Sequence, residues 1–281
     1  MKMHKYLFLI CSLTGFALSA QALELCGSLN QGEIVVGKTA KGSEVFWGGE
    51  NIAVDGDGKF LIAFGRDDKD TKELLLQNSN GTKDKYSLAV APTKWNIQNI
   101  TGVPPRKVSP SDADLAAIDK ENRLLRKAFK NIDNNVFWHE GFIAPVEGRI
   151  SGEFGGQRIM NKIPKNPHRG MDIAAKEGTP VKASASGKVV LAYPDLFYSG
   201  NVVVIDHGFG LQTVYAHLKE IKVKLEDEVK QGDIIGLVGK TGRATGPHLH
   251  FGASLRNIRF NPQSLLDMNK NAQKCFTLPT K

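Results

Sequence analysis

The sequence predicts a mainly β protein with a small N-terminal β domain, a helical linker and a C-terminal antiparallel β domain. Short β-rich segments separated by glycine and Asx residues fill the first hundred positions. A segment with helical periodicity follows a proline-containing stretch, and β-branched runs with glycine turns return from about residue 140. With 281 residues, 41% of them hydrophobic, the chain has enough apolar material for two folded domains.

Residues 1–22 have the features of an export signal. Lys2 and Lys5 supply positive charge, residues 6–20 form an apolar run, and Ala20-Gln21-Ala22 is a small-residue cleavage site. We interpret the segment as a cleaved signal peptide rather than a retained membrane anchor, because the apolar run is short and interrupted for a span. We therefore expect an exported protein with no membrane span after signal removal.

Export decides how the cysteines and the charge are interpreted. Cys11 leaves with the signal, so Cys26 and Cys275 remain in an oxidising compartment, which favours a disulfide over two free thiols. The net charge is +8, of which Lys2 and Lys5 account for two. Export argues against nucleic acid as a partner. A basic exterior would suit an anionic polymer such as cell wall, and a simple effect on solubility explains the charge equally well.

The N-terminal β domain is expected over residues 23–105. Glycine and Asx residues divide its β-rich segments into short strands, most clearly in Asp55-Gly56-Asp57-Gly58. This spacing predicts a small antiparallel sandwich or barrel. The expected strands include residues 33–36, 44–47, 51–54 and 59–64.

Residues 106–135 are expected to form a proline-containing linker and a helix over about 110–132. Ser109 is a good N-cap residue, Pro110 fits the first helical turn, and Asp112 nearly completes a capping box. Apolar residues recur at helical spacing. They are Leu115, Ile118, Leu125, Phe129 and Ile132.

The C-terminal β domain is expected over residues 136–265, followed by a tail over 266–281. Residues 202–205 and 234–238 are apolar runs typical of buried strands. Residues 177–181 resemble residues 231–235, since each is a glycine turn that leads into an apolar strand. We interpret the two segments as similar hairpins within one compact β domain.

Five of the seven histidines lie between residues 168 and 250, and two spacings among them matter. His248 and His250 are two residues apart, and His168 precedes Asp172 by four. Because alternate side chains of a strand share one face, each pair is expected to point to the same side, with Leu249 in the core. Two imidazoles and a carboxylate suit a catalytic zinc site with a fourth position for water. The spacing leaves open which member of the histidine pair would bind the metal.

The C-terminal domain contains five motifs that form one pattern. They are His168-Arg169-Gly170-Met171-Asp172-Ile173-Ala174, Gly178-Thr179-Pro180-Val181, Ile205-Asp206-His207-Gly208, Tyr215-Ala216-His217-Leu218 and Thr241-Gly242-Arg243-Ala244-Thr245-Gly246-Pro247-His248-Leu249-His250-Phe251. With these motifs the domain closely resembles the lysostaphin/LytM-type zinc metallopeptidases of the cell wall. The resemblance covers about residues 145–265, and the last motif is long and specific.

This resemblance implies a role for each histidine in the two pairs. The family's zinc ligands fall on His168, Asp172 and His250, and its catalytic non-ligand histidines fall on His217 and His248. The implied function is a zinc-dependent endopeptidase that hydrolyses peptide cross-bridges of peptidoglycan with zinc-activated water, in the periplasm. The alternative is a non-catalytic relative that binds cell wall or activates an amidase. Neither the bond cleaved, the role of the N-terminal domain nor the oligomeric state follows from the sequence.

Two positions receive a structural rather than a catalytic interpretation. His207 belongs to a family motif, but we expect it to make a structural hydrogen bond within its turn. Glu226 stands where the family commonly has glycine, which puts the local turn in question without affecting the metal site. We also expect the N-terminal domain to cover part of the cleft in the resting protein.

Overall fold

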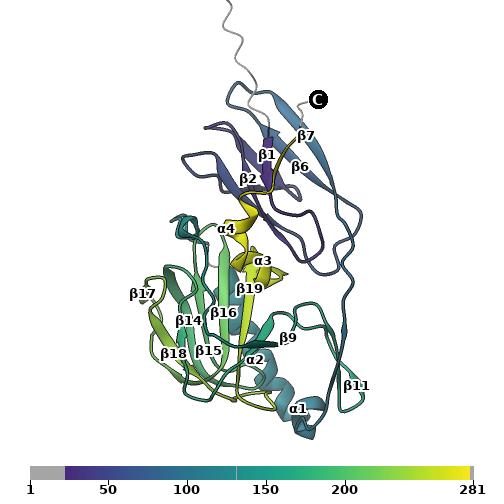
Figure 1. Ribbon diagram of the computed structural model, residues 1–281, viewed down its shortest axis with the longest axis vertical. Helices are drawn as coiled ribbons and strands as arrows, with labels where there is room; N and C mark the ends of the chain where they lie inside the picture. The colour runs from purple at the N-terminus through teal and green to yellow at the C-terminus, as the bar shows by residue number, and fades with distance from the viewer. Residues whose placement is uncertain (1–22, 131, 279–281) are drawn as a thin grey trace, which may run out of the picture.

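The computed structural model describes residues 23–130 and 132–278, which form two β units joined by a helix (Figure 1). The mainly β fold class predicted from the sequence is confirmed. The predicted signal peptide, residues 1–22, lies outside the described residues. Among the helices within 23–130 and 132–278, none combines the length and the apolar character needed to cross a membrane.

The N-terminal unit packs two antiparallel four-stranded sheets face to face. Alternate side chains point inward from both sheets, so that Leu25, Val35 and Leu74 are fully buried between them. One sheet has the order β21-β1-β2-β5, with β1 Leu23–Cys26, β2 Ile34–Lys38, β5 Lys59–Ala63 and β21 Cys275–Leu278. The other has the order β4-β3-β6-β7, with β3 Glu44–Trp47, β4 Glu50–Ile52, β6 Thr71–Gln77 and β7 Lys83–Ala89.

The expected strands of this unit are all present, and their ends differ from the prediction by at most two residues. The segment expected as a C-terminal tail contains β21, which pairs with β1 (Figure 1). Cys26 and Cys275 are register partners in this pair and form a disulfide, as expected from export. The chain therefore begins and ends, within its described part, in the same sheet. The predicted domain boundaries themselves stay predictions.

Two helices lie in the linker, and they correct the predicted start of the long helix. The short helix α1, Pro105–Val108, ends at Ser109, which is its C-cap. The long helix α2, Asp112–Lys130, begins two residues after Pro110. The amide of Asp114 donates to Ser111 Oγ over 3.3 Å, and the amide of Ser111 donates to the carboxylate of Asp114 over 3.1 Å. Ser111 is therefore the N-cap of α2. Ser109 cannot start this helix because it already caps the end of α1.

The C-terminal unit is built on a large antiparallel sheet of order β17-β14-β15-β16-β19-β12-β9. Its strands are β9 Arg149–Gly152, β12 Met171–Ala174, β14 Gly187–Leu196, β15 Gly200–Asp206, β16 Leu211–Ile221, β17 Glu228–Val229 and β19 His248–Leu255. Strand β20, Ile258–Phe260, pairs with β19, and β18, Ile234–Val238, pairs with β16 and with β13, Pro180–Lys182. The two segments expected as similar hairpins thus pair with each other, through β13 and β18.

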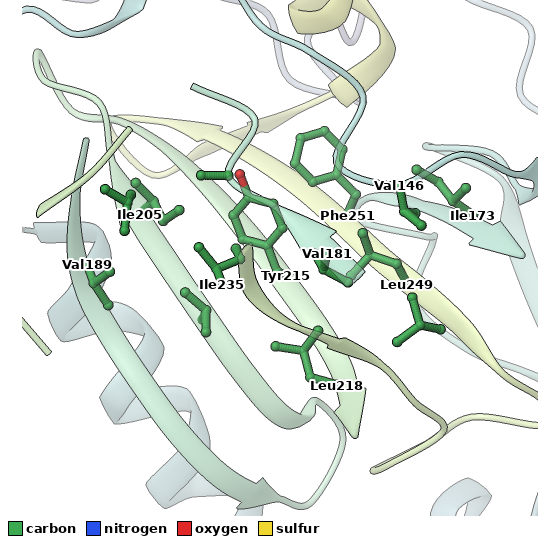
Figure 2. Close-up of a cluster of buried hydrophobic side chains, with 14 of the residues drawn as sticks. Val146, Ile173, Val181, Val189, Ile205, Tyr215, Leu218, Ile235, Leu249 and Phe251 are labelled. Atoms are coloured by element: carbon green, nitrogen blue, oxygen red, sulfur yellow. The ribbon is translucent and has the colours of Figure 1, made fainter. Parts of the chain in front are cut away.

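A hydrophobic core lies on one face of this sheet. Tyr215, Leu249 and Phe251 point into it from β16 and β19, where Val181 and Ile235 from β13 and β18 meet them (Figure 2). All five side chains are fully buried. Since successive side chains of a strand alternate, the neighbours of these residues along β16 and β19 point to the opposite face. That second face carries the histidines.

A smaller sheet and several packed residues connect the two units. Strand β8, Ile97–Ile100, pairs in parallel with β10, Gln157–Met160, which pairs with β11, Ile163–Pro164. Leu61 and Ala63 of the sandwich pack against Phe209 and Phe260 of the C-terminal unit. The short segments Trp138–Glu140 (3₁₀), α3 Pro262–Leu266 and α4 Met268–Asn271 complete the connection.

The turn that contains Glu226 adopts the conformation for which glycine is best suited. Glu226 has φ 74°, in the left-handed region, and its amide donates to the carbonyl of Val189 over 2.9 Å. Its carboxylate forms an ion pair with Lys188. The backbone of the turn therefore forms despite the departure from glycine. Glu226 lies just before β17, where β17 pairs with β14, away from the histidines.

Candidate metal centre

Strand register brings Asp172 and His250 together. Asp172 on β12 is the register partner of His250 on β19, and His250 is the partner of Ala216 on β16. Leu249 is fully buried in the core behind β19, so His248 and His250 face the other side, as their spacing predicts. The side chains of Asp172 and His250 consequently meet on one face of the sheet.

His168 reaches the same face by a different route from the one predicted. It lies in the loop before β12, so strand alternation does not relate it to Asp172, and that expectation was wrong. Backbone contacts hold the loop instead: the amide of His168 donates to the carbonyl of Gly156 over 2.9 Å. The ring nitrogen Nδ1 of His168 lies 3.0 Å from the carbonyl oxygen of Glu153, which fixes the ring and leaves Nε2 free to act as a ligand.

Three donor atoms converge at this point. His168 Nε2 lies 3.1 Å from Asp172 Oδ1 and 3.0 Å from His250 Nδ1, and His250 Nδ1 lies 2.9 Å from the same carboxylate oxygen. His168 and Asp172 are buried. Two imidazole nitrogens and one carboxylate oxygen at the corners of a small triangle match the ligand set of a catalytic zinc ion. Within residues 23–130 and 132–278, the other group of potential ligands includes Cys26 and Cys275, which are already joined in the disulfide.

The protonation states favour metal binding. Burial lowers the pKa of His168 to about 4, and burial also lowers the pKa of His250, so both rings are neutral at neutral pH. Burial alone would raise the pKa of Asp172, but its contacts with His168 and His250 outweigh burial and hold the pKa well below its usual value. Neutral imidazoles and an ionised carboxylate are the forms in which these side chains bind metals.

Arg158 on β10 supports the carboxylate from its other side. Its guanidinium donates a hydrogen bond to Asp172 Oδ2, which leaves Oδ1 directed toward the two histidines. Its Nε also donates to Gln98 Oε1 over 3.3 Å, and Gln98 is the register partner of Arg158 in the pair formed by β8 and β10. Arg158 has no local signature in the sequence, and its contact with Asp172 exists only in the folded protein.

His217 and His248 flank the three donor atoms. The ring centroids of His217 and His248 are 4.8 Å apart, and those of His217 and His250 are 5.8 Å apart. Nδ1 of His217 lies 2.8 Å from the carbonyl oxygen of Thr241, and Nδ1 of His248 lies 2.8 Å from that of Gly246. In both rings Nε2 is therefore the nitrogen left for other partners, and Nε2 of His248 is 3.8 Å from Asp172 Oδ1.

His217 occupies this position because β16 departs from regular geometry. In regular alternation His217 would share the core-facing side of Tyr215. Its φ is 64°, a conformation that is uncommon for a residue with a side chain, and the register with β15 shifts between Asn201 and Val203. His217 thus lines the same cavity as Ala216. The backbone strain at this residue is typical of functional sites.

The cavity beside the donor atoms has a volume of about 220 Å³. Three histidines line the cavity: His168, His217 and His250. The other lining residues were not predicted from the sequence as residues of the site. Chief among these are Glu121 and Leu125, which belong to α2. The others include Arg158, Arg169, Tyr198, Arg243 and Arg259.

His207 has a structural role, as expected, but the hydrogen-bond partners of its side chain lie outside its own turn. Its two ring nitrogens each lie 2.7 Å from a partner, the carbonyl oxygen of Ser186 and Oγ1 of Thr213, and the side chain is fully buried. The neighbouring Asp206 accepts hydrogen bonds from the amides of Gly208 and Asp133. Both side chains are therefore committed to the fold and do not line the cavity of the other histidines.

The fold and the site define this protein as an antiparallel β protein with a candidate mononuclear metal site on one sheet face. Residues 166–262 match the family model described as peptidase family M23. These residues therefore form a peptidase M23 domain, in agreement with the lysostaphin/LytM-type motifs that they contain.

Curated relatives and a solved structure extend the comparison. The chain is 37% identical over 167 residues to the peptidoglycan DD-endopeptidase ShyA of Vibrio cholerae, covering 58% of this chain and 34% of that protein. It is 43% identical over 120 residues to the DD-carboxypeptidase/endopeptidase Mpg of Neisseria meningitidis, covering 43% and 27%. The chain thus spans about a third of the length of these relatives. A crystal structure from Pseudomonas aeruginosa assigned to peptidase M23 superposes with a TM-score of 0.67 at 27% identity, covering 86% of this chain and 96% of that one.

Proposed function

We propose that this protein is an exported, zinc-dependent endopeptidase that hydrolyses peptide cross-bridges of bacterial peptidoglycan in the periplasm. The observation that carries the proposal is the convergence of His168 Nε2, Asp172 Oδ1 and His250 Nδ1, each within 3.1 Å of the others, beside two further histidines. The peptidase M23 domain supports the reaction class. The relatives named as peptidoglycan endopeptidases support the substrate.

In this proposal His168, Asp172 and His250 hold the zinc ion, and His217 and His248 act on the substrate. A bound zinc ion would supply an activated water and polarise the scissile carbonyl. With Nδ1 of each ring directed to a backbone carbonyl, the Nε2 atoms of His217 and His248 are available to position the water, to transfer its proton and to stabilise the developing oxyanion. Glu121 and Leu125 of α2 form part of the cavity wall beside these atoms.

The test separates metal ligands from catalytic non-ligands. His168→Ala and His250→Ala should lower both bound zinc and activity, because each removes one of only three protein ligands. His217→Ala and His248→Ala should keep nearly stoichiometric zinc and lose on the order of 10²–10⁴ in kcat, the scale of a general acid–base or oxyanion group. Elemental analysis of the purified variants, with turnover of a cross-linked muropeptide, measures both quantities.

His139 offers a matched control, since it pairs with Asp55 of the sandwich and does not line the cavity. His139→Ala should therefore retain both zinc and activity. If His248→Ala loses zinc while His250→Ala keeps it, the ligand assignment is reversed. Wild-type protein that carries zinc and binds peptidoglycan without cleaving it would instead support the alternative, a non-catalytic wall-binding or amidase-activating relative.

A further inference from the structure

An excess of arginine surrounds the cavity of the candidate metal centre. Arg158 contacts Asp172, but in the described part of the chain no carboxylate lies within ion-pair distance of Arg169, Arg243 or Arg259. The acidic residue of α2 in the cavity wall, Glu121, is already engaged. Its oxygens accept hydrogen bonds from the amides of Tyr198 and Ser199 and from Ser199 Oγ, over 2.6–3.0 Å.

Two of these arginines are held in place by aromatic rings. The guanidinium of Arg243 lies 4.2 Å from the ring centroid of Tyr198, and that of Arg259 lies 4.0 Å from the ring centroid of Phe129. Stacking of this kind restricts a guanidinium while its edge, which carries the hydrogen-bond donors, stays available. Arg243 and Arg259 are thus preorganised donors without an acidic partner.

The arrangement is electrostatically unfavourable without an anion. Burial, with a smaller contribution from the positive charge of Arg169, lowers the pKa of Arg259 to about 10. Burial is also the main cause that lowers the pKa of Arg243, and repulsion from Arg158 adds to it; the opposing contributions from Tyr198 and Glu121 are smaller than that of burial. Partly buried positive charges that line one cavity are stabilised when an anion binds there.

A groove with more basic than acidic side chains adjoins these residues; Asp67 and Asp68 are its only carboxylates among the described residues. The groove, of about 940 Å³, shares His168, Arg169 and Arg259 with the cavity. It continues past the exposed side chains of Arg126 and Lys130 on α2. Such a surface attracts anionic ligands toward the histidines.

We propose that Arg243 and Arg259 form a carboxylate-binding subsite beside the candidate metal centre, which selects peptides with a free carboxylate near the scissile bond over their amides. The proposal rests on the proposed function for the identity of the substrate, a cross-linked wall peptide. A guanidinium binds a carboxylate through two parallel hydrogen bonds, whereas a neutral amide lacks the charge and the second acceptor oxygen. The subsite therefore sets which peptides bind and does not take part in bond cleavage.

Binding of two matched peptides tests the proposal without requiring turnover. The probes are a purified cross-linked muropeptide with free carboxylates and the same muropeptide with those carboxylates converted to methylamides. Titration calorimetry with the zinc-loaded mature chain carrying His217→Ala, which we expect not to consume the peptide, gives the two dissociation constants. We expect roughly ten- to hundredfold tighter binding of the carboxylate form, the scale of one charged hydrogen-bonded contact.

Variants then assign the preference to the two arginines. Arg243→Gln and Arg259→Gln, each in the His217→Ala background, should bind the two probes with more similar affinity. Arg259→Lys keeps the charge but loses the planar pair of donors, so it should retain part of the preference. Arg123→Gln is the matched control, since Arg123 is an exposed arginine of α2 that pairs with Asp119 and does not line the cavity or the groove.

The outcomes are distinct for the subsite and for the proposed function. The subsite would be overturned by equal affinity for both probes in the protein that keeps Arg243 and Arg259. An unchanged preference for the carboxylate probe in both glutamine variants would also overturn it. Either result would leave the endopeptidase proposal standing. If the protein that keeps His217 cleaves neither probe, the endopeptidase proposal is overturned. A measured preference for the carboxylate probe would still support the subsite.

Discussion

The two oxygens of Asp172 have different partners, and this division depends on one arginine. Oδ1 faces His168 and His250, whereas Oδ2 accepts a hydrogen bond from Arg158. A carboxylate held in this way presents one defined oxygen to a metal ion, and residues that orient metal ligands typically contribute ten- to hundredfold to affinity. Arg158 is in turn held by Gln98 of β8, so the pairing of β8 with β10 contributes to the geometry of the site.

We predict that Arg158→Gln weakens zinc binding by about tenfold or more, because the carboxylate of Asp172 then loses its fixed orientation. Competition with a chromophoric chelator measures the dissociation constant. Arg149→Gln removes the same charge from an exposed position on β9 and should leave zinc affinity unchanged. If Arg158→Gln binds zinc as tightly as wild type or more tightly, repulsion of the zinc ion by the charge of Arg158 outweighs any positioning role of this residue.

At the scale of elements, the N-cap residue determines where helix α2 begins. Ser109 and Ser111 both have the side chain of an N-cap residue, and sequence pattern alone favoured Ser109 because Pro110 follows it. In the structure Ser109 closes α1, whereas Ser111 and Asp114 exchange hydrogen bonds in a capping box. Asp114 also pairs with Arg106 of α1, so the two helices share one carboxylate.

We predict that Ser111→Ala lowers the free energy of unfolding by about 1 kcal/mol, the usual contribution of an N-cap side chain. Ser109→Ala, two residues away, should change it by a few tenths of a kcal/mol at most, since its side chain caps neither helix. Urea unfolding of the two variants decides between the positions. Equal destabilisation by both would contradict the assignment of Ser111 as the cap.

At the scale of the whole molecule, α2 covers part of the sheet face that carries the histidines. Phe129 of α2 packs against Val204 and Val214 of that face, and Ala216, the register partner of His250, belongs to the same cluster. Glu121, only 3% exposed, binds the loop amides of Tyr198 and Ser199. The helix is thus a wall of the cavity, and we expect it to restrict the access of a long substrate.

We predict that Glu121→Gln loosens α2 and raises the rate of peptidoglycan hydrolysis, by up to about tenfold, because a charged acceptor of two backbone amides is lost. Hydrogen exchange of α2 should accelerate in parallel. Asp119→Asn changes an exposed carboxylate on the same helix and should affect neither quantity. Faster exchange without faster hydrolysis would mean that α2 does not restrict the substrate.

The disulfide is the other feature of the whole molecule, because it joins residues 249 positions apart. It closes the sheet in which β1 pairs with β21. We predict that replacing Cys26 and Cys275 with serine lowers the free energy of unfolding by about 5 kcal/mol in the chain-entropy description, with a smaller loss where the unfolded chain is compact. Denaturant unfolding with and without reductant measures it. If wild type is no less stable in reductant, the bond does not constrain the chain.

Local patterns in the sequence determined the class of the fold and several of its strands. Strand alternation predicted the orientation of His248, Leu249 and His250, because side-chain direction in a strand depends only on spacing. The periodicity of residues 110–132 predicted α2, and export predicted the disulfide between Cys26 and Cys275. The choice of His168, Asp172 and His250 as ligands came from family resemblance, since spacing alone left the histidine pair unresolved.

Tertiary structure alone decided what surrounds those residues. His168 approaches Asp172 from a loop, and His217 turns to the cavity through a left-handed backbone at a bulge, neither of which has a periodic signature. Arg158 contacts Asp172 on one side and Gln98, 60 residues away in sequence, on the other only in the folded protein, where β8 pairs with β10. Arg243 and Arg259 meet at one cavity only when separate hairpins and α2 pack together. Contacts between distant segments depend on the packing of whole elements, which no local pattern in the sequence encodes.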